Sequence, residues 1–264
     1  MYVERGSCTS LRKNCQTMIK RRALIVGNTQ GETGVGVDII NYVSFLTSAE
    51  GGAWEPGEIN VLYNPTHDDV IVDLCLFERQ NLDYFMFIFA GHGGFSKQHN
   101  DNIMELSVQD DVSEDLKESE TLDIAPRQLN ILDCCRCYCN EEMVKQAKES
   151  INASMQMTNY RTLARQLYDH QIMKSCGGTS SLYACSINEE AKGDSVKGGI
   201  FSNALLDMSG FRRENRIYTV EEAMIHAKAL VAKNRFTKQT PTSCLARCKY
   251  GQQLPWAVNP LLLS

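Results

Sequence analysis

The sequence lacks the features that would place the chain in a membrane or among disordered and fibrous proteins. Its longest apolar run, Tyr84–Ala90, has seven residues, whereas a membrane-spanning helix needs about 20. The N-terminal segment contains no apolar stretch of the secretory-signal type. Proline is sparse, with 6 residues in 264, and no segment is of low complexity. We therefore expect a folded protein without a membrane span or a secretory signal.

An excess of positive charge is also missing. Lys and Arg number 27 against 32 Asp and Glu, which gives a net charge of −5. A mildly acidic chain is poorly suited to bulk binding of nucleic acid or an anionic membrane, so we expect neither partner. With 43% hydrophobic residues the chain can form a sizeable core. We expect residues 21–258 to form a single domain, preceded by an N-terminal extension at 1–20.

Cysteine, in contrast, is abundant. There are 11 cysteines, an odd number that cannot all pair within the chain. Four of them fall within Cys134–Cys139, too close together for ordinary mutual disulfides. The simplest interpretation is free thiols in a reducing cytoplasm. The run CCRCYC also lacks the paired C-x₂-C spacing of a tetrahedral zinc site, so we expect no metal there.

Short apolar runs alternate with helical patterns along the chain. Runs of this length suit strands that are covered on both faces. Strands are predicted at Ala23–Gly27, Glu58–Tyr63, Tyr84–Ala90, Leu129–Asp133, Ser181–Cys185 and Ser243–Arg247. Helices are predicted between them, most clearly over Val220–Lys233, where Thr219 and Glu222 have capping-box spacing. This order predicts an α/β fold: a three-layer αβα sandwich around a mostly parallel, six-stranded sheet.

In such sheets the chemistry lies beyond the carboxyl ends of the strands. The loop after the first strand, GNTQGETGVGVD, is rich in glycine but lacks the spacing of a nucleotide-binding loop. His92 follows the third strand and has glycine on both sides, and the backbone N–H of Gly93 beside it could stabilise an oxyanion. On this feature alone, a loop histidine without a function is an equally good interpretation.

Two adjacent cysteines, Cys134 and Cys135, follow the fourth strand. A thiol at the end of a central strand, near a strand-end histidine, is the arrangement that a thiolate nucleophile needs. Successive residues of a strand point to opposite faces, so only one of the two thiols can face His92. The other is expected to be a small buried packing residue.

Taken together, these motifs resemble the caspase-like cysteine peptidases, the superfamily of caspases and metacaspases. IFAGHGG is similar to the strand-His-Gly motif, LDCCRC to the cysteine motif, GETGVGVD to the loop after the first strand, and LYACSINEEAKGD with GGIFSNALL to the small-subunit half. The resemblance implies His92 and Cys135 as catalytic residues, with the N–H groups of Gly93 and Cys135 as the oxyanion site. The family's cysteine motif reads D-S-C-H-S-G in many metacaspases and Q-A-C-R-G in caspases. The chain departs from these motifs after the nucleophile, where Arg136 and Cys137 stand, although Arg136 alone is like the caspase motif.

The resemblance also implies a substrate-binding pair, Glu32 and Asp133, because family members place charged residues at these positions. Two carboxylates would favour a long cationic side chain over an acidic one. We therefore expect an endopeptidase that cleaves polypeptides after Arg, then Lys, and requires no cofactor for its chemistry. The chain resembles a compact, bacterial-type member.

Regulation is left open by the sequence. Within a linker at 141–178, between large-subunit-like (21–140) and small-subunit-like (179–258) parts, Lys145 and Lys148 are candidate self-cleavage sites. The segment Gln109–Thr121 is expected to be an acidic surface loop, and Asp110, Asp111, Glu114 and Asp115 within it are candidate ligands for activating calcium. A small-molecule or protein activator is a further candidate.

Two other functions stay open at this point. One is a catalytically silent caspase-like scaffold or binding domain. The other is a small-molecule-gated sensor of a defence system.

Overall fold

The computed structural model describes residues 19–30, 34–109, 112–137, 159–211, 216–234, 237–249 and 251–259. Most of the expected N-terminal extension, and both candidate self-cleavage sites Lys145 and Lys148, lie outside these residues. Ile19, the first described residue, packs against the core. No helix of the described ranges is both long and apolar enough to cross a membrane.

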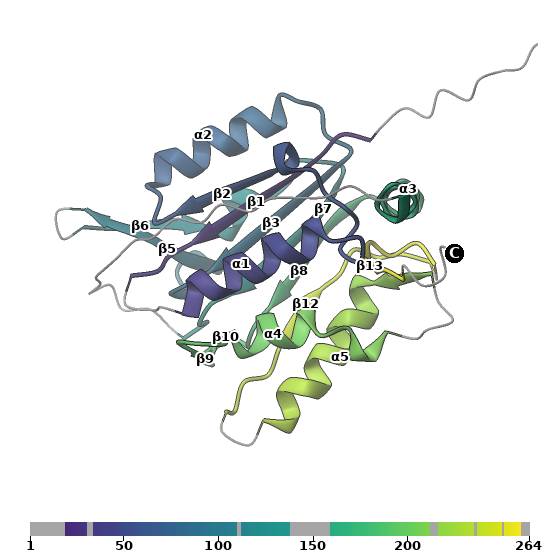
Figure 1. Ribbon diagram of the computed structural model, residues 1–264. Coiled ribbons are helices and arrows are strands. Elements are labelled where there is room, and N and C mark those ends of the chain that lie inside the picture. The colour runs from purple at the N-terminus through teal and green to yellow at the C-terminus, as the bar shows by residue number, and fades with distance from the viewer. Residues whose placement is uncertain are drawn as a thin grey trace, which may run out of the picture.

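A six-stranded sheet forms the centre of the molecule, in the order β12-β8-β7-β3-β1-β2 (Figure 1). Five of the strands are parallel, and β12 pairs antiparallel with β8 at one edge. The strands are β1 (Arg21–Gly27), β2 (Ile59–Tyr63), β3 (Tyr84–Ala90), β7 (Arg127–Asp133), β8 (Gly178–Tyr183) and β12 (Thr242–Cys244). The predicted α/β fold with a mostly parallel, six-stranded sheet is confirmed.

Helices cover both faces of this sheet. One face is covered by α2 (His67–Glu78), and the other carries α1 (Gly34–Thr47), α3 (Asn159–Lys174), α4 (Ile200–Leu206) and α5 (Val220–Lys233). The predicted capping box of α5 is present, because Thr219 accepts a hydrogen bond from the N–H of Glu222. A second capping box begins α2, where Thr66 accepts from the N–H of Asp69. Short elements complete the fold: η1 (Pro56–Glu58), η3 (Met208–Gly210), the hairpin β9 (Gly193–Asp194) and β10 (Gly198–Gly199), and the pair β11 (Ile217–Thr219) and β13 (Pro255–Val258).

The third strand shows why the apolar runs are continuous. All seven residues of β3 are buried. Phe85, Phe87 and Phe89 pack under α2, whereas Tyr84, Met86 and Ile88 pack against the helices of the opposite face. A strand that is buried on both faces has no solvent-facing side, so its sequence does not alternate between apolar and polar residues.

The sequence prediction was wrong for the acidic segment Gln109–Thr121, which is not a surface loop. It contains β6 (Val112–Lys117) and a 3-10 helix, η2 (Glu118–Thr121). A separate antiparallel sheet is formed by β4 (Gly93–Ser96), β5 (Asp101–Gln109) and β6. Leu116 is its buried anchor in the second half of β6. Only Val112 and Leu116 are apolar in this strand, too few for a strand period to be recognised in the sequence.

The expectation that all thiols are free was also wrong, because Cys176 and Cys248 form a disulfide. The pair joins the start of β8 to the C-terminal segment across a sequence separation of 72 residues. The N–H of Cys176 also donates a hydrogen bond to the carbonyl of Gln252. The cytoplasmic location was inferred from free thiols, so this bond removes part of that argument.

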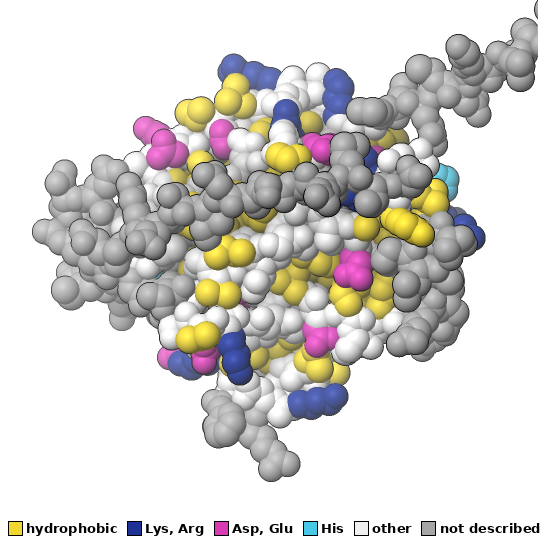
Figure 2. Space-filling model, in the orientation of Figure 1, with side chains coloured by type: hydrophobic (Ala, Val, Ile, Leu, Met, Phe, Trp, Pro, Cys, Tyr) yellow, Lys and Arg dark blue, Asp and Glu magenta, His cyan; other side chains and the backbone are white. Residues whose placement is uncertain are grey.

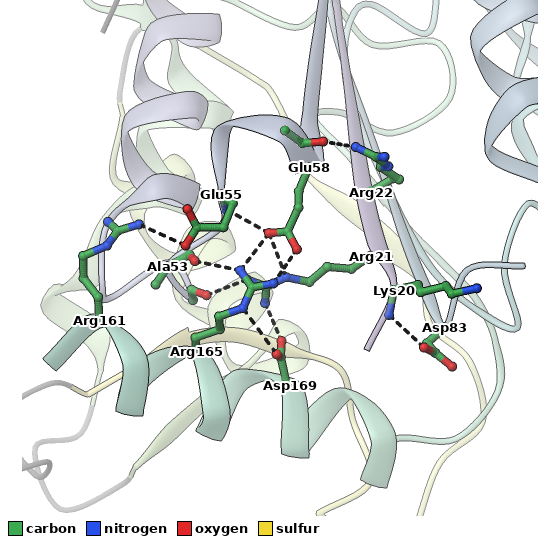
Figure 3. Close-up of polar contacts among 12 residues, drawn as sticks. Lys20, Arg21, Arg22, Ala53, Glu55, Glu58, Asp83, Arg161, Arg165 and Asp169 are labelled. Carbon is green, nitrogen blue, oxygen red and sulfur yellow. Dashed lines mark hydrogen bonds and ion pairs between the residues drawn. The ribbon is translucent and has the colours of Figure 1, made fainter. Parts of the chain in front are cut away.

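A buried ionic cluster fixes α3 to the amino end of the sheet (Figure 3). The guanidinium of Arg21, on β1, has no exposed surface and donates to Asp169 of α3 at 2.7 Å. Its second carboxylate partner, Glu58, also pairs with Arg165 of α3. The Arg21 guanidinium stacks 4.4 Å from the ring centroid of Trp54. Burial lowers the pKa of Arg21, and the carboxylates of Asp169 and Glu58 oppose that shift.

Because the charge of Arg21 is fully buried, its carboxylate partners are needed for stability. We predict that Asp169→Asn lowers the free energy of unfolding by about 3 kcal/mol, the cost of uncovering a buried charge. The matched control is Asp83→Asn, which removes a carboxylate that only accepts from the exposed N–H of Lys20 and should cost less than about 1 kcal/mol. Urea denaturation of the two variants beside the parent measures both values. Equal losses would contradict a special role for Asp169.

Candidate active site

The ends of β3 and β7 bring together the two residues that the sequence singled out. In the sheet, Ala90 is paired with Asp133. The pairing continues beyond the strands: Gly91 N–H donates to Asp133 at 3.2 Å, and Phe95 N–H donates to Cys137 at 2.9 Å. His92 and Cys135 each lie two residues beyond the paired strand ends, between these two hydrogen bonds. The backbone therefore places both residues at the carboxyl edge of the sheet, beyond the ends of two neighbouring strands.

The imidazole of His92 is held in one tautomer. Its Nε2 lies 3.1 Å from the carbonyl oxygen of Gln30. A carbonyl can only accept, so Nε2 carries the hydrogen in the neutral ring. The remaining nitrogen, Nδ1, then has a free lone pair and is the atom that can take a proton from a thiol.

Gly91 allows His92 to take this position. Its backbone φ of +151° is a value that residues with a Cβ rarely adopt. A Cβ at Gly91 would approach the Cβ of Asn28 to 2.9 Å. Asn28 itself is fixed, because its N–H donates to Ala90 and its side-chain amide donates to Glu105. A larger residue at 91 would separate the loops after β1 and β3.

Cys135 is partly buried beneath the loop that follows β8. Its Sγ lies 3.6 Å from the carbonyl oxygen of Ala191, to which the S–H donates. Two backbone hydrogen bonds, from Arg136 to Glu189 and from Asn188 to Arg136, hold this loop against the cysteine motif. Burial raises the pKa of the Cys135 thiol. The resting side chain is therefore a thiol, and thiolate formation needs a proton acceptor beside it.

The backbone N–H of Gly93 is available for an oxyanion. In the β4–β5 ladder, Glu105 N–H donates to His92, so Gly93 and Met104 form the next, non-hydrogen-bonded pair. The N–H of Gly93 consequently points away from β5. A Cβ at Gly93 would meet Sγ of Cys134 at 2.9 Å, which explains why glycine stands there. Cys134 is 1% exposed and packs in the core, as expected for the second cysteine.

Arg136, one of the departures from the family motifs, is a buried anchor. Its Nε donates to Asn102 at 2.7 Å, and its guanidinium lies 4.1 Å from the ring centroid of Tyr183. Asn102 in turn donates to the buried carboxylate of Glu118, which also accepts from the hydroxyl of Tyr183. Arg136 therefore ties the cysteine motif to β5, η2 and β8.

Asp133, the predicted substrate-binding residue at the end of β7, is buried beside a second carboxylate that the sequence analysis did not single out. Asp133 accepts from the backbone N–H of Ser202 at 3.0 Å and from its hydroxyl at 2.5 Å. The second carboxylate is Asp38 of α1, which accepts from the N–H of Gly199 at 2.9 Å. A Cβ at Gly198 or Gly199 would collide with one of these carboxylates, so both glycines are required.

The two carboxylates perturb each other. Burial, and then the charge of Asp133, raise the pKa of Asp38 to about 8. Burial also raises the pKa of Asp133, while Ser202 opposes that shift. The pair therefore holds a proton at neutral pH, and a cation placed beside it would release that proton.

The other expected substrate carboxylate, Glu32, lies outside the described residues. A signal for Asp38 was present in the sequence: a helical spacing of four places it on the buried stripe with Tyr42 and Leu46. A carboxylate on an apolar stripe is rarely buried without a function or a partner.

The candidate calcium ligands do not converge where they are described. Asp110 and Asp111 lie outside the described residues. Glu114 and Asp115 are neighbours on β6, so their side chains project to opposite faces. Glu114 accepts a hydrogen bond from the N–H of His67. Asp115 lies opposite Glu105 in the register of β5 and β6. Within the described ranges, no three His, Cys, Asp or Glu side chains cluster as metal ligands.

Comparison with known proteins agrees with this geometry. The family model described as "Caspase domain" matches residues 20–258. The chain belongs to the caspase domain family. Its fold is similar to that of caspase-1 from Spodoptera frugiperda, with a TM-score of 0.54 and 12% identity, over 89% of this chain and 91% of that one. No curated protein sequence matches the chain.

Membership of this cysteine peptidase family makes the choice between the two adjacent thiols decisive. We predict that iodoacetamide near neutral pH labels Cys135 before Cys134, because burial raises the pKa of Cys134 well above its usual range and shields its sulfur. Mass spectrometry of the peptide that carries both cysteines measures the order, with Cys135→Ala and Cys134→Ala as the matched variants. Faster labelling of Cys134 would reverse the assignment.

Proposed function

We propose that the chain is a cysteine endopeptidase that uses His92 and Cys135 and cleaves after Arg, then Lys. The observation that carries this proposal is the pair of hydrogen bonds, Gly91 to Asp133 and Phe95 to Cys137. They extend the β3–β7 pairing on both sides of the two residues. The positions of the two residues therefore follow from the backbone hydrogen bonds of the folded domain.

The chemistry follows from the atoms available. Nδ1 of His92 takes the proton of Cys135, and the thiolate attacks the scissile carbonyl carbon. The N–H groups of Gly93 and Cys135 stabilise the negative oxygen of the tetrahedral intermediate. His92 then protonates the leaving amine, and afterwards it removes a proton from the water that hydrolyses the acyl-enzyme. Every step uses groups of this chain, the substrate and water.

The preference for Arg rests on the pair of carboxylates at the strand ends. Asp133 immediately precedes the two cysteines, and Asp38 lies beside it. A guanidinium bound there would form charge-assisted hydrogen bonds to two carboxylates and remove their mutual repulsion. The carboxylate of an acidic substrate would add a further negative charge in a buried setting. Glu32 is proposed as a further contributor from the loop after β1.

The direct test compares fluorogenic peptides that differ only in the residue before the scissile bond. We predict cleavage after Arg, weaker cleavage after Lys and none detectable after Asp. Cys135→Ala should abolish cleavage, while Asp38→Asn and Asp133→Asn should each lower kcat/KM for Arg peptides by roughly 10- to 100-fold, as expected for losing one charged partner. Preference for Asp peptides would refute the acidic pair as the specificity determinant.

Because Asp38 and Asp133 share a proton at neutral pH, we predict that the KM for Arg peptides depends on pH. In the free protein Asp38 is protonated below about pH 8, and guanidinium binding requires its ionised form. The KM for Arg peptides should therefore fall as the pH rises toward about 8 and then level off. In Asp38→Asn this fall should disappear, because the titrating group is gone. A KM that is independent of pH in the parent protein would show that Asp38 does not face the substrate.

The other expected properties remain part of the proposal. Burial of the Cys135 thiol favours a protein that needs activation, by a ligand or protein or by self-cleavage near Lys145 and Lys148. Proteolysis measured in chelator and in millimolar calcium tests calcium as the activator. Charges of both signs are interspersed over the face shown in Figure 2, which supports polypeptide substrates over nucleic acid. A cytoplasmic location stays a proposal, and a silent scaffold is the alternative if Cys135→Ala changes nothing.

A further inference from the structure

Glu105 of β5 stands directly opposite His92 in the β4–β5 sheet. Gly93 is paired with Met104, so the preceding residue, His92, is opposite Glu105. The hydrogen bond from Glu105 N–H to the carbonyl of His92, at 3.1 Å, confirms this pairing. Side chains of directly opposed residues project from the same face, with Cβ atoms about 5 Å apart. The carboxylate of Glu105 is therefore a neighbour of the His92 imidazole.

The position of this carboxylate is fixed through its backbone, and the imidazole of His92 is the group beside it that can carry a positive charge. The backbone of Glu105 is fixed by two hydrogen bonds, the one to His92 and another that its carbonyl accepts from Asn28 at 2.9 Å. Within the described ranges, its side chain is partly buried and takes part in no hydrogen bond or ion pair. Burial raises its pKa and the charge of His92 lowers it. The remaining charged neighbour is Asp115, opposite Glu105 on β6.

The charges around Cys135 create the need for such a group. Transfer of the thiol proton to Nδ1 breaks the S–H bond, forms an N–H bond and produces a thiolate and an imidazolium. Burial opposes this step at the sulfur, and the nearby carboxylate of Glu190 opposes it further. The exposed Lys192 favours the thiolate but is itself paired with Glu190. Stabilisation of the imidazolium on the histidine side is another way to favour the ion pair.

We propose that Glu105 is a positioning residue that stabilises the protonated form of His92 and so promotes formation of the Cys135 thiolate. This inference rests on the proposed function of the His92–Cys135 pair. Glu105 acts through His92 and contacts neither the thiol nor the scissile bond. A carboxylate close to a partly exposed imidazolium favours the ion pair by about three- to tenfold.

Alkylation of Cys135 by iodoacetamide tests this role without any peptide substrate. The rate is measured against pH, by mass spectrometry of the Cys135 peptide, in the parent protein and in Glu105→Gln. We expect Glu105→Gln to slow alkylation about fivefold near neutral pH, where the thiolate exists only as the ion pair. The rates should converge at alkaline pH, where the thiol ionises without help. Glu105→Asp should restore part of the neutral rate.

Two controls separate this effect from a structural one. Glu114→Gln makes the same change on the neighbouring strand but on the face toward His67, and it should leave the profile unchanged. In a His92→Ala background, Glu105→Gln should have no further effect, because the group that it acts on is gone. An equal loss at all pH values, or an effect that persists without His92, would overturn the proposal.

Peptide cleavage supplies the second readout. If peptides are cleaved, Glu105→Gln should lower kcat and leave KM unchanged, and a change confined to KM would assign Glu105 to substrate binding instead. If no peptide is cleaved but the alkylation profile depends on Glu105 as expected, the proposed function fails and this inference stands. If peptides are cleaved and the profile ignores Glu105, the inference fails alone.

Discussion

The parallel pairing of β3 with β7 is the constraint on which the rest of the molecule depends. Both strands are buried, so their backbone groups can find partners only in the ladder. The pairing is therefore fixed along its whole length, and it continues two hydrogen bonds beyond the strand ends. A histidine and a cysteine placed two residues beyond those ends are thus aligned by the sheet itself. The glycines at 91 and 93 are the local consequence, because each lies where a side chain would collide with a neighbouring segment.

The central sheet and its helices could be predicted from sequence because their signal is local. Strands such as β3 are unbroken apolar runs, and helices such as α5 begin with a capping box and carry an apolar stripe. The same local signals placed His92 and Cys135 at strand ends. In contrast, β6 has charged residues along much of its length and one buried leucine in its described part. It exists because it pairs with β5, and that pairing is invisible in its own sequence.

The features that were missed all depend on residues far apart in the sequence. Cys176 and Cys248 are brought together by the packing of β8 against the C-terminal segment, so their spacing carried no information. Asp38 is unremarkable within its helix and acquires meaning only beside Asp133, at the end of another element. Glu105 likewise becomes a neighbour of His92 only through the register of the second sheet. Residue type and local pattern were enough to point to His92 and Cys135 as candidates, whereas the charged groups around them could be identified only from the fold.

Two of the buried groups of charges in the described residues differ in a way that separates structure from function. Around Arg21, carboxylates and guanidinium groups alternate, so each charge is compensated and nothing is left to bind a ligand (Figure 3). At Asp38 and Asp133, two groups of the same sign share a buried site, and burial with mutual repulsion keeps a proton there. A purely structural role would be served as well by amides, which carry no such penalty. This unfavourable pair is the reason that we propose a site completed by a cation, which the side chain of an arginine substrate would supply.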